Sequence, residues 1–403
     1  MDGIPYLFKN PELFFLQWAA RFDLRSKQIT RHLELGEKTP QGSRLRRVTQ
    51  AEQTNWERLK SLVPELLQKC GTQDTSTHTS LSVLGSRIAA TQHLESYWDT
   101  AFRDWSWGAS EVQSTLQWIG SAVQRDWKTA AILGSGAGGL ASRLATQNST
   151  TAWWAVDINP ALLQVHRRMN LGEALSLFEI PLNPKGMDHV AYEQKLSASG
   201  PKPSNLTLLA SDALQPCFRP KSLDAVLTSW FVDIIPEDFK SFARRINPLL
   251  CPGGTWIIHG PQGFSNPFSS SSYTDEESCQ ILKDSGFEVI SLEQREQPYL
   301  HSPHGRQKRL EQVSLIVALK KSQCQAPAAY SSDPDYLVHR DQPIGPLSEF
   351  EEWIIDSRAR AEILSAIDGK RSFNEIAKLI SHHYRIAEAD AAVILTQLLT
   401  SRY

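Results

Sequence analysis

The sequence Ala131-Ile-Leu-Gly-Ser-Gly-Ala-Gly-Gly-Leu140 joins a short apolar run to a glycine-rich turn, and a helical window, Leu140 to Ala145, follows the turn. Glycines at these positions let the chain turn tightly and let a ligand approach the backbone N–H groups at a helix start. A strand, a glycine-rich turn and a helix in this order are typical of a nucleotide-binding site, although the glycines alone are a weak motif.

Short apolar runs alternate with helical windows on both sides of this turn, throughout residues 128–321. This alternation predicts an α/β fold with a mostly parallel, doubly wound sheet that binds ligands at the carboxyl ends of its strands. The predicted strands are residues 130–133, 152–156, 206–209, 223–227, 255–258, 287–290 and 313–319.

Three further regions flank this core. Residues 1–127 have a helical apolar period, including a helix interrupted at Pro64, and are expected to contribute to the cover of the active site. Residues 322–335 are rich in Pro, Ala and Ser and are predicted to be a linker. Residues 336–403 are predicted to form a small helical module.

Acidic residues follow the second and third predicted strands of the core. Asp157 follows the second strand, where a carboxylate can accept both hydroxyls of a ribose. Asp212, followed by Ala213, comes directly after the third strand and is placed to meet an adenine amino group. One acid for the ribose and one for the base imply an adenosine ligand.

The composition restricts the class of protein. The chain has 42 Lys and Arg against 44 Asp and Glu, a formal charge of −2, which gives no reason to expect a nucleic-acid or membrane-surface partner. It lacks an apolar run of about 18 residues and a secretory signal pattern, so we expect a soluble, cytoplasmic protein. The five cysteines are scattered singly, which favours reduced thiols over disulfides or a metal site.

The second half of the core carries a more specific pattern. The fourth strand, Asp224 to Val232, leads to a predicted helix, Glu237 to Ile246, and then to Leu249-Leu-Cys-Pro-Gly-Gly-Thr-Trp-Ile-Ile258. This series resembles the class I S-adenosylmethionine (SAM)-dependent methyltransferases, in which an "L-x-P-G-G" turn precedes the fifth strand. The resemblance implies a Rossmann-like methyltransferase with SAM as its cofactor.

Finer matches resemble one branch of that superfamily, the carnosine N-methyltransferase family. The matching motifs are Arg103-Asp-Trp-Ser106, Thr228-Ser-Trp-Phe-Val-Asp233, Trp256-Ile-Ile-His-Gly-Pro261, and Tyr273-Thr-Asp-Glu-Glu followed by Ser285-Gly-Phe-Glu288. The resemblance covers about residues 95–320.

The resemblance implies roles for residues that bind the cofactor. Gly134 and Gly136, with Gly138 in the same turn, would face the methionine part of SAM. Asp157 would bind the ribose and Asp212 the adenine. Arg103 would bind the cofactor carboxylate from an N-terminal helix that closes the site.

Asp233 matches the family's aspartate that holds the substrate imidazole. A carboxylate that accepts the imidazole N–H fixes the tautomer and directs the bare nitrogen at the methyl group. Positioning then supplies most of the acceleration, and no metal is required. The alternative for Asp233 is a helix N-cap, because Pro236 would lie in the first turn of a following helix.

The chain departs from this family after the fifth strand. The family has a histidine there, whereas this chain has Gly263-Phe-Ser-Asn266, in which Phe264 is a candidate substrate contact. His259 either points toward the site instead or is packed within its strand. Tyr299 falls where a substrate tyrosine is expected. A different imidazole or an amine is therefore as good a candidate substrate as carnosine.

The C-terminal module resembles the winged-helix fold of PqqD-like peptide-recognition domains through Ile367-Asp-Gly-Lys-Arg-Ser-Phe-Asn-Glu-Ile-Ala377. Ser372 and Glu375 are predicted to form a capping box at a helix start. Such domains bind a leader peptide as an added strand. Packing or homodimerisation is the alternative, and DNA is disfavoured because acidic residues are frequent and bases few.

The sequence as a whole predicts a SAM-dependent N-methyltransferase that acts on an imidazole nitrogen of a histidine-containing small molecule or peptide. Two alternatives remain open. One is a non-catalytic binding or regulatory protein with a methyltransferase-like core. The other is an O- or C-methyltransferase of a secondary metabolite or ribosomal peptide.

Overall fold

The computed structural model describes residues 3–9, 11–71, 95, 97–123, 126–235, 237–263, 273–325 and 348–400. The chain forms two compact units, Met1–Ser332 and Asp333–Tyr403, and the division between them falls inside the predicted linker. In the described part of the chain, every helix is too short or too polar to span a membrane.

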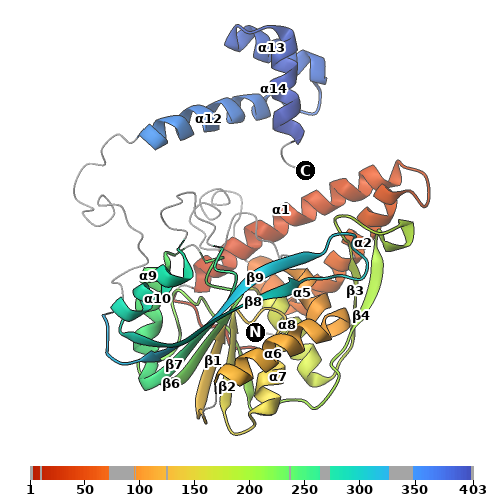
Figure 1. The fold of residues 1–403 in the computed structure, drawn as a ribbon. Helices are drawn as coiled ribbons and strands as arrows, with labels where there is room; N and C mark the ends of the chain where they lie inside the picture. The colour runs from red at the N-terminus through yellow and green to blue at the C-terminus, as the bar shows by residue number, and fades with distance from the viewer. Residues whose placement is uncertain are drawn as a thin grey trace. The chain divides into compact units, whose positions relative to one another are not determined.

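The first unit is built on a seven-stranded sheet within the described residues, with the strand order β5-β2-β1-β6-β7-β9-β8 (Figure 1). Strand β9 runs antiparallel to both of its neighbours, and the pairs from β5 to β7 are all parallel. The α/β, mostly parallel, Rossmann-like sheet that the sequence predicts is therefore confirmed. The strands are β1 (Thr129–Leu133), β2 (Ala152–Asp157), β5 (Leu206–Ala210), β6 (Leu223–Ser229), β7 (Leu250–Gly260), β8 (Phe287–Tyr299) and β9 (Arg309–Lys320).

Helices cover both faces of this sheet because its central strands are apolar on both sides. In β1, Ala130 and Ile132 pack in one core with α6 and α7, whereas Ala131 and Leu133 pack in another with α9 and α10. The α8 helix contacts β2 and β5. The bounds are α6 (Ala109–Ala122), α7 (Gly139–Gln147), α8 (Pro160–Leu171), α9 (Phe239–Ile246) and α10 (Asp275–Asp284), and the short 3₁₀ turn η3 (Asn247–Leu249) follows α9.

The N-terminal helices belong to the same compact unit as the sheet. They share a core with α8 and with a two-stranded antiparallel ribbon, β3–β4, that the sequence did not predict. Asn55 on α2 joins them, because its side chain donates to Phe178 O at 2.8 Å and accepts from Phe178 N at 2.7 Å. The elements are α1 (Pro11–Glu37), α2 (Arg44–Leu62), α3 (Pro64–Gly71), α5 (Trp98–Phe102), the π-helix η1 (Arg103–Trp107), β3 (Leu175–Glu179), the 3₁₀ turn η2 (Met187–His189) and β4 (Tyr192–Leu196).

The described part of the C-terminal unit consists of α12 (Ser348–Ser365), α13 (Phe373–Tyr384) and α14 (Glu388–Thr400). Its core contains Ile363, Ile376 and Leu395. The predicted capping box is confirmed: Ser372 Oγ accepts from Glu375 N, and the Glu375 carboxylate accepts from Ser372 N. Residues 348–400 hold helices only, so the strands of a wing are not among them.

Candidate active site

The glycine-rich turn connects β1 to α7 and depends on glycine at three positions. Gly134, Gly136 and Gly138 have φ values of 69°, 55° and 86°, in the left-handed region that favours glycine. A Cβ at Gly134 would lie 2.1 Å from the Phe231 ring, and one at Gly138 would lie 2.1 Å from the His166 ring. These two glycines therefore allow Phe231, which follows β6, and His166, on α8, to pack closely against the turn.

Gly136 differs, because its α-carbon faces open space. A Cβ built there would meet nothing in the described residues closer than Thr100 Oγ1, at 3.9 Å. The turn thus presents an open backbone surface at the carboxyl edge of the parallel strands, where α/β sheets bind their ligands.

Asp157, at the end of β2, lies directly beside this turn. Its Oδ2 accepts a hydrogen bond from Gly136 N at 2.7 Å, and its Oδ1 accepts one from Asn159 N at 2.8 Å. Burial raises the pKa of Asp157, although these backbone N–H donors oppose the rise. A carboxylate fixed in this way retains lone pairs for ligand hydroxyls, and its role toward a ribose stays a prediction.

Asp212 and Ala213 follow β5 at the same edge of the sheet. Leu214 N donates to Asp212 Oδ1 at 2.8 Å, which closes a tight turn, and Ala213 is buried. An extended N-terminal segment lies alongside: Leu7 N donates to Ala210 O at 2.8 Å. No local sequence pattern indicates this segment, because its contacts join Leu7 to Ala210, far apart in the chain.

The Arg-Asp-Trp-Ser motif lies in η1 and forms hydrogen bonds with the backbone of the glycine-rich turn and of the start of α7. Asp104 Oδ2 accepts from Gly139 N at 2.8 Å, and Trp105 Nε1 donates to Ala137 O at 2.7 Å. Arg103 donates from Nε to Asp104 Oδ1 at 2.9 Å. Burial lowers the pKa of Arg103, but Asp104 and its other anionic neighbours outweigh burial and raise it overall. Arg103 is thus a fixed cation, and its contact with a cofactor carboxylate stays a prediction.

Asp233 follows β6 and is not a helix cap. The predicted helix starts later than expected, at Phe239 rather than Glu237, because Asp238 is its N-cap and accepts from Lys240 N at 2.9 Å. Asp233 Oδ1 is buried and has no hydrogen-bond partner among the residues that the structure describes. Burial raises the pKa of this carboxyl. An unpaired buried acceptor is costly unless a ligand satisfies it.

An aromatic wall lies close to Asp233. Trp230 stacks on Tyr299, with ring centroids 4.1 Å apart, and the guanidinium of Arg309 lies 5.0 Å from the Tyr299 centroid. Trp230 has a φ of 53°, rare for a bulky residue, and its N donates to His259 O at 2.7 Å. Such strain at a strand end is common in functional sites.

Tyr97, which is 46% exposed, interacts electrostatically with acids in both halves of the site. Burial of part of its side chain raises the pKa of Tyr97, and the charges of Asp157 and Asp233 both raise it further. The pKa of Tyr299 is also raised, chiefly by burial and in part by Asp233 and Tyr97. Sequence reasoning missed Tyr97, because it precedes α5 in a segment without hydrophobic periodicity.

His259 is enclosed beneath this wall. Its Nδ1 is 2.9 Å from Ser229 Oγ and its Nε2 is 3.1 Å from Gln297 Oε1, so both ring nitrogens have protein partners. Burial lowers its pKa to about 4. In this arrangement the His259 ring meets the Trp230 ring edge to face, with centroids 6.0 Å apart, and has no nitrogen left for a substrate. Phe264, also predicted as a substrate contact, lies outside the described residues.

Comparisons with known proteins find similarity at the level of solved structures only. No family model and no curated protein matches the chain. A SAM-dependent methyltransferase from Methanosarcina mazei is 16% identical with a TM-score of 0.35, covering 50% of this chain and 96% of its own. One from Aquifex aeolicus is 14% identical with a TM-score of 0.33, covering 55% and 92%.

A third similar structure, from Thermotoga maritima, is described as a SAM-dependent methyltransferase and possible histamine N-methyltransferase. It is 13% identical with a TM-score of 0.33, and the match covers 56% of this chain and 93% of that one. At such values the likeness does not indicate an activity or a substrate for this chain.

Proposed function

We propose that this protein is a SAM-dependent N-methyltransferase that methylates an imidazole nitrogen in a histidine-containing small molecule or peptide. The observation that carries the proposal is the buried Oδ1 of Asp233, which has no partner in the described residues and lies at the same sheet edge as the glycine-rich turn.

The residues at the carboxyl edge fit SAM. The open face of Gly136 leaves room for the cofactor against the turn. Asp157 would accept the ribose hydroxyls, Asp212 would bind the adenine amino group, and Arg103 would pair with the methionine carboxylate. Bound SAM would supply a methyl group on a sulfonium sulfur, and the lone pair of an acceptor nitrogen would displace S-adenosylhomocysteine from it.

Asp233 would orient the acceptor. A neutral imidazole has one N–H and one bare nitrogen, so a carboxylate that accepts the N–H leaves the other nitrogen free to react. Positive charge develops on the ring during methylation, and the Asp233 carboxylate stabilises it in a partly dehydrated site. The ring proton that methylation makes more acidic is already hydrogen-bonded to Asp233 and can leave through that carboxylate.

The aromatic wall would hold the flat ring. The stacked pair of Trp230 and Tyr299 presents aromatic surface close to Asp233, and such surface favours a planar ring that gains positive charge. Orientation by one carboxylate and one wall is the kind of positioning that can supply most of the acceleration of a substitution reaction.

The test is mass spectrometry of reactions with SAM and a panel of imidazoles: histidine, carnosine, other histidine dipeptides and histidine-containing peptides. We expect one panel member to gain one methyl group. Asp233→Asn should lose about 100-fold in kcat/KM while calorimetry shows unchanged S-adenosylhomocysteine binding. Asp157→Asn should instead lose the binding of S-adenosylhomocysteine. Asp284→Asn, an exposed change on α10, serves as the matched control.

Each contrary result contradicts a different part of the proposal. Binding of S-adenosylhomocysteine without methylation of any panel member would contradict the imidazole acceptor and favour an oxygen or carbon acceptor or a non-catalytic role. Full activity of Asp233→Asn on an imidazole would contradict the orienting carboxylate. Absence of S-adenosylhomocysteine binding would contradict the cofactor itself.

A further inference from the structure

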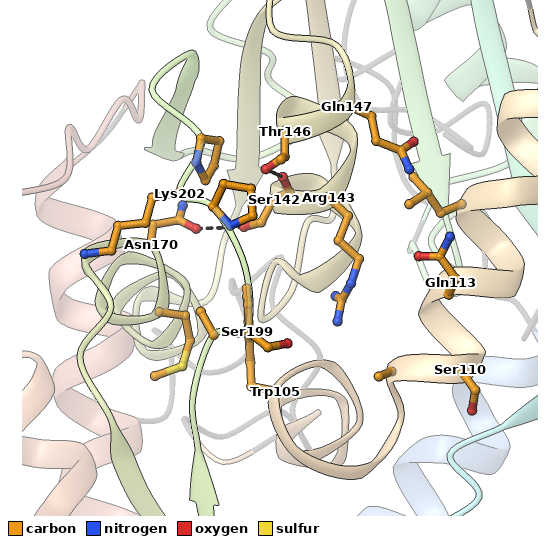
Figure 2. Close-up of a pocket in the computed structure, with 16 residues that line it drawn as sticks. Trp105, Ser110, Gln113, Ser142, Arg143, Thr146, Gln147, Asn170, Ser199 and Lys202 are labelled. Atoms are coloured by element: carbon orange, nitrogen blue, oxygen red, sulfur yellow. Dashed lines mark hydrogen bonds between the residues drawn. The ribbon is translucent and has the colours of Figure 1, made fainter.

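A cavity lies behind the glycine-rich turn, away from the strand-end acids. Its volume is about 560 Å³, within the range of small-molecule sites, and it is bordered by η1, α6, α7, the end of α8 and the segment that follows β4 (Figure 2). Trp105 and Ser142 line it, whereas Asp157, Asp212 and Asp233 do not. The proposed cofactor and acceptor therefore do not account for this cavity.

The lining of the cavity is positively charged. Its sixteen lining residues include Arg143 and Lys202 and no Asp or Glu. The remaining polar side chains are uncharged amides and hydroxyls, such as Gln113, Gln147 and Ser199. Such a lining attracts anions and offers no carboxylate to a cationic ligand.

Arg143 brings a positive charge into this cavity. Figure 2 shows its side chain extending from α7 into the cavity, between Ser199 and Gln113. It donates from Nη1 to Gly139 O at 2.8 Å and from Nη2 to Asp104 O at 3.3 Å, both neutral carbonyls. Among the described residues it forms no ion pair with a carboxylate within 4.0 Å. Burial lowers the pKa of Arg143, and the nearby Asp104 carboxylate, which already accepts hydrogen bonds from Arg103 and from Gly139 N, offsets this lowering only in part.

The cavity also has an apolar part. The Arg143 guanidinium lies 5.9 Å from the centroid of the Trp105 ring, and Leu116, Pro201 and Pro203 continue this surface. A guanidinium beside aromatic and aliphatic side chains matches a ligand that has one carboxylate and one apolar body. We infer that this cavity is a binding site for a small-molecule carboxylate with an aromatic or aliphatic body, held by an ion pair to Arg143.

The test uses phenylacetate as the probe and neutral phenylacetamide as its matched control, titrated calorimetrically into the full chain. A ligand of about ten non-hydrogen atoms should bind with a dissociation constant on the order of 1 mM or below. Phenylacetamide should bind at least tenfold more weakly. Arg143→Gln should weaken phenylacetate binding at least tenfold, whereas Arg360→Gln, an exposed arginine of the C-terminal unit, should leave it unchanged.

Two further variants keep the inference falsifiable if Arg143→Gln does not fold. Gln113→Glu is an exposed change on α6 that adds an anion beside the cavity, and it should weaken phenylacetate binding by repulsion. Arg103→Gln removes the cation of the proposed cofactor site, which does not line this cavity, and should leave phenylacetate binding intact. Loss of phenylacetate binding in Arg103→Gln but not in Gln113→Glu would overturn the inference. Equal binding of phenylacetate and phenylacetamide would also overturn it. So would the absence of phenylacetate binding at a concentration 5-fold above the expected dissociation constant.

Discussion

At the level of single residues, two glycines of the same turn are required for different physical reasons. Phe231 fills the space beside Gly134, where a Cβ would lie 2.1 Å from the ring. Gly136 faces space in which the nearest described atom to a Cβ is 3.9 Å away. Both have positive φ, so alanine strains the backbone equally at the two positions. Comparing alanine variants at the two positions therefore tests whether a ligand occupies the open space in front of Gly136.

We therefore predict opposite phenotypes for the two alanine variants. Gly134→Ala should lower the free energy of unfolding by about 2–4 kcal/mol, because backbone strain and overpacking add. Gly136→Ala should cost only about 1–2 kcal/mol but should weaken S-adenosylhomocysteine binding at least tenfold, because its methyl group would occupy the cofactor's place. Urea unfolding and calorimetry measure the two effects. Normal binding by a folded Gly136→Ala would place the cofactor elsewhere.

At the level of elements, one buried carboxylate connects η1 to α7. Asp104 in η1 accepts from Gly139 N at the start of α7, and the same side chain fixes Arg103. A negative charge at a helix N-terminus is favourable, and this one is only 4% exposed, so water screens it little. The position of the turn relative to η1 thus depends on Asp104.

We predict that Asp104→Asn lowers the free energy of unfolding by about 3 kcal/mol, because it removes the carboxylate that pairs directly with the largely buried Arg103 guanidinium. It should also weaken S-adenosylhomocysteine binding, since both the turn and Arg103 lose their support. Asp238→Asn is the matched control: asparagine caps helices as well as aspartate, so its cost should stay within about 1 kcal/mol. Equal melting temperatures for the two variants would contradict the connecting role of Asp104.

The elements of the sheet could be predicted because each strand combines an apolar run with a boundary on either side. The ribbon β3–β4 could not, because each strand has only five residues and its buried positions are separated by half-buried or exposed ones, which leaves no continuous apolar run. Asp157, Asp212 and Asp233 could be placed because strand ends follow from the sequence. Tyr97 and the contact of Trp105 with Ala137 depend on how α5 and η1 dock against the sheet, and no local pattern encodes that docking.

At the level of the whole molecule, the near balance of acidic and basic residues does not reveal which groups change protonation on folding. His166 and His259 are fully buried in the first unit, and burial lowers their pKa values to about 3 and about 4, from an ordinary 6.5. Asp157 and Asp233 have pKa values raised by burial, so they take up protons in the folded state as the pH falls. The histidines and the carboxyls therefore act in opposite directions.

The histidine contribution has a definite sign and pH window. Below 6.5 the unfolded chain binds a proton at His259 that the folded chain excludes until about pH 4, so unfolding is favoured progressively as the pH falls through this window. The full effect is on the order of 3 kcal/mol per buried histidine. We predict that the free energy of unfolding, measured by urea titration, falls from pH 7 to pH 4.5.

The variant His259→Gln should fall less steeply over the same range than the wild type, because it removes one of the groups that takes up a proton only on unfolding. His382→Gln, an exposed change on α13, should reproduce the wild-type slope. Comparing slopes rather than absolute stabilities removes the packing cost of the substitution, which does not depend on pH. It also removes the opposing contribution of Asp157 and Asp233, which all three proteins share. Parallel curves for wild type and His259→Gln would mean that His259 binds its proton in the folded protein, in conflict with its enclosure between Ser229 and Gln297.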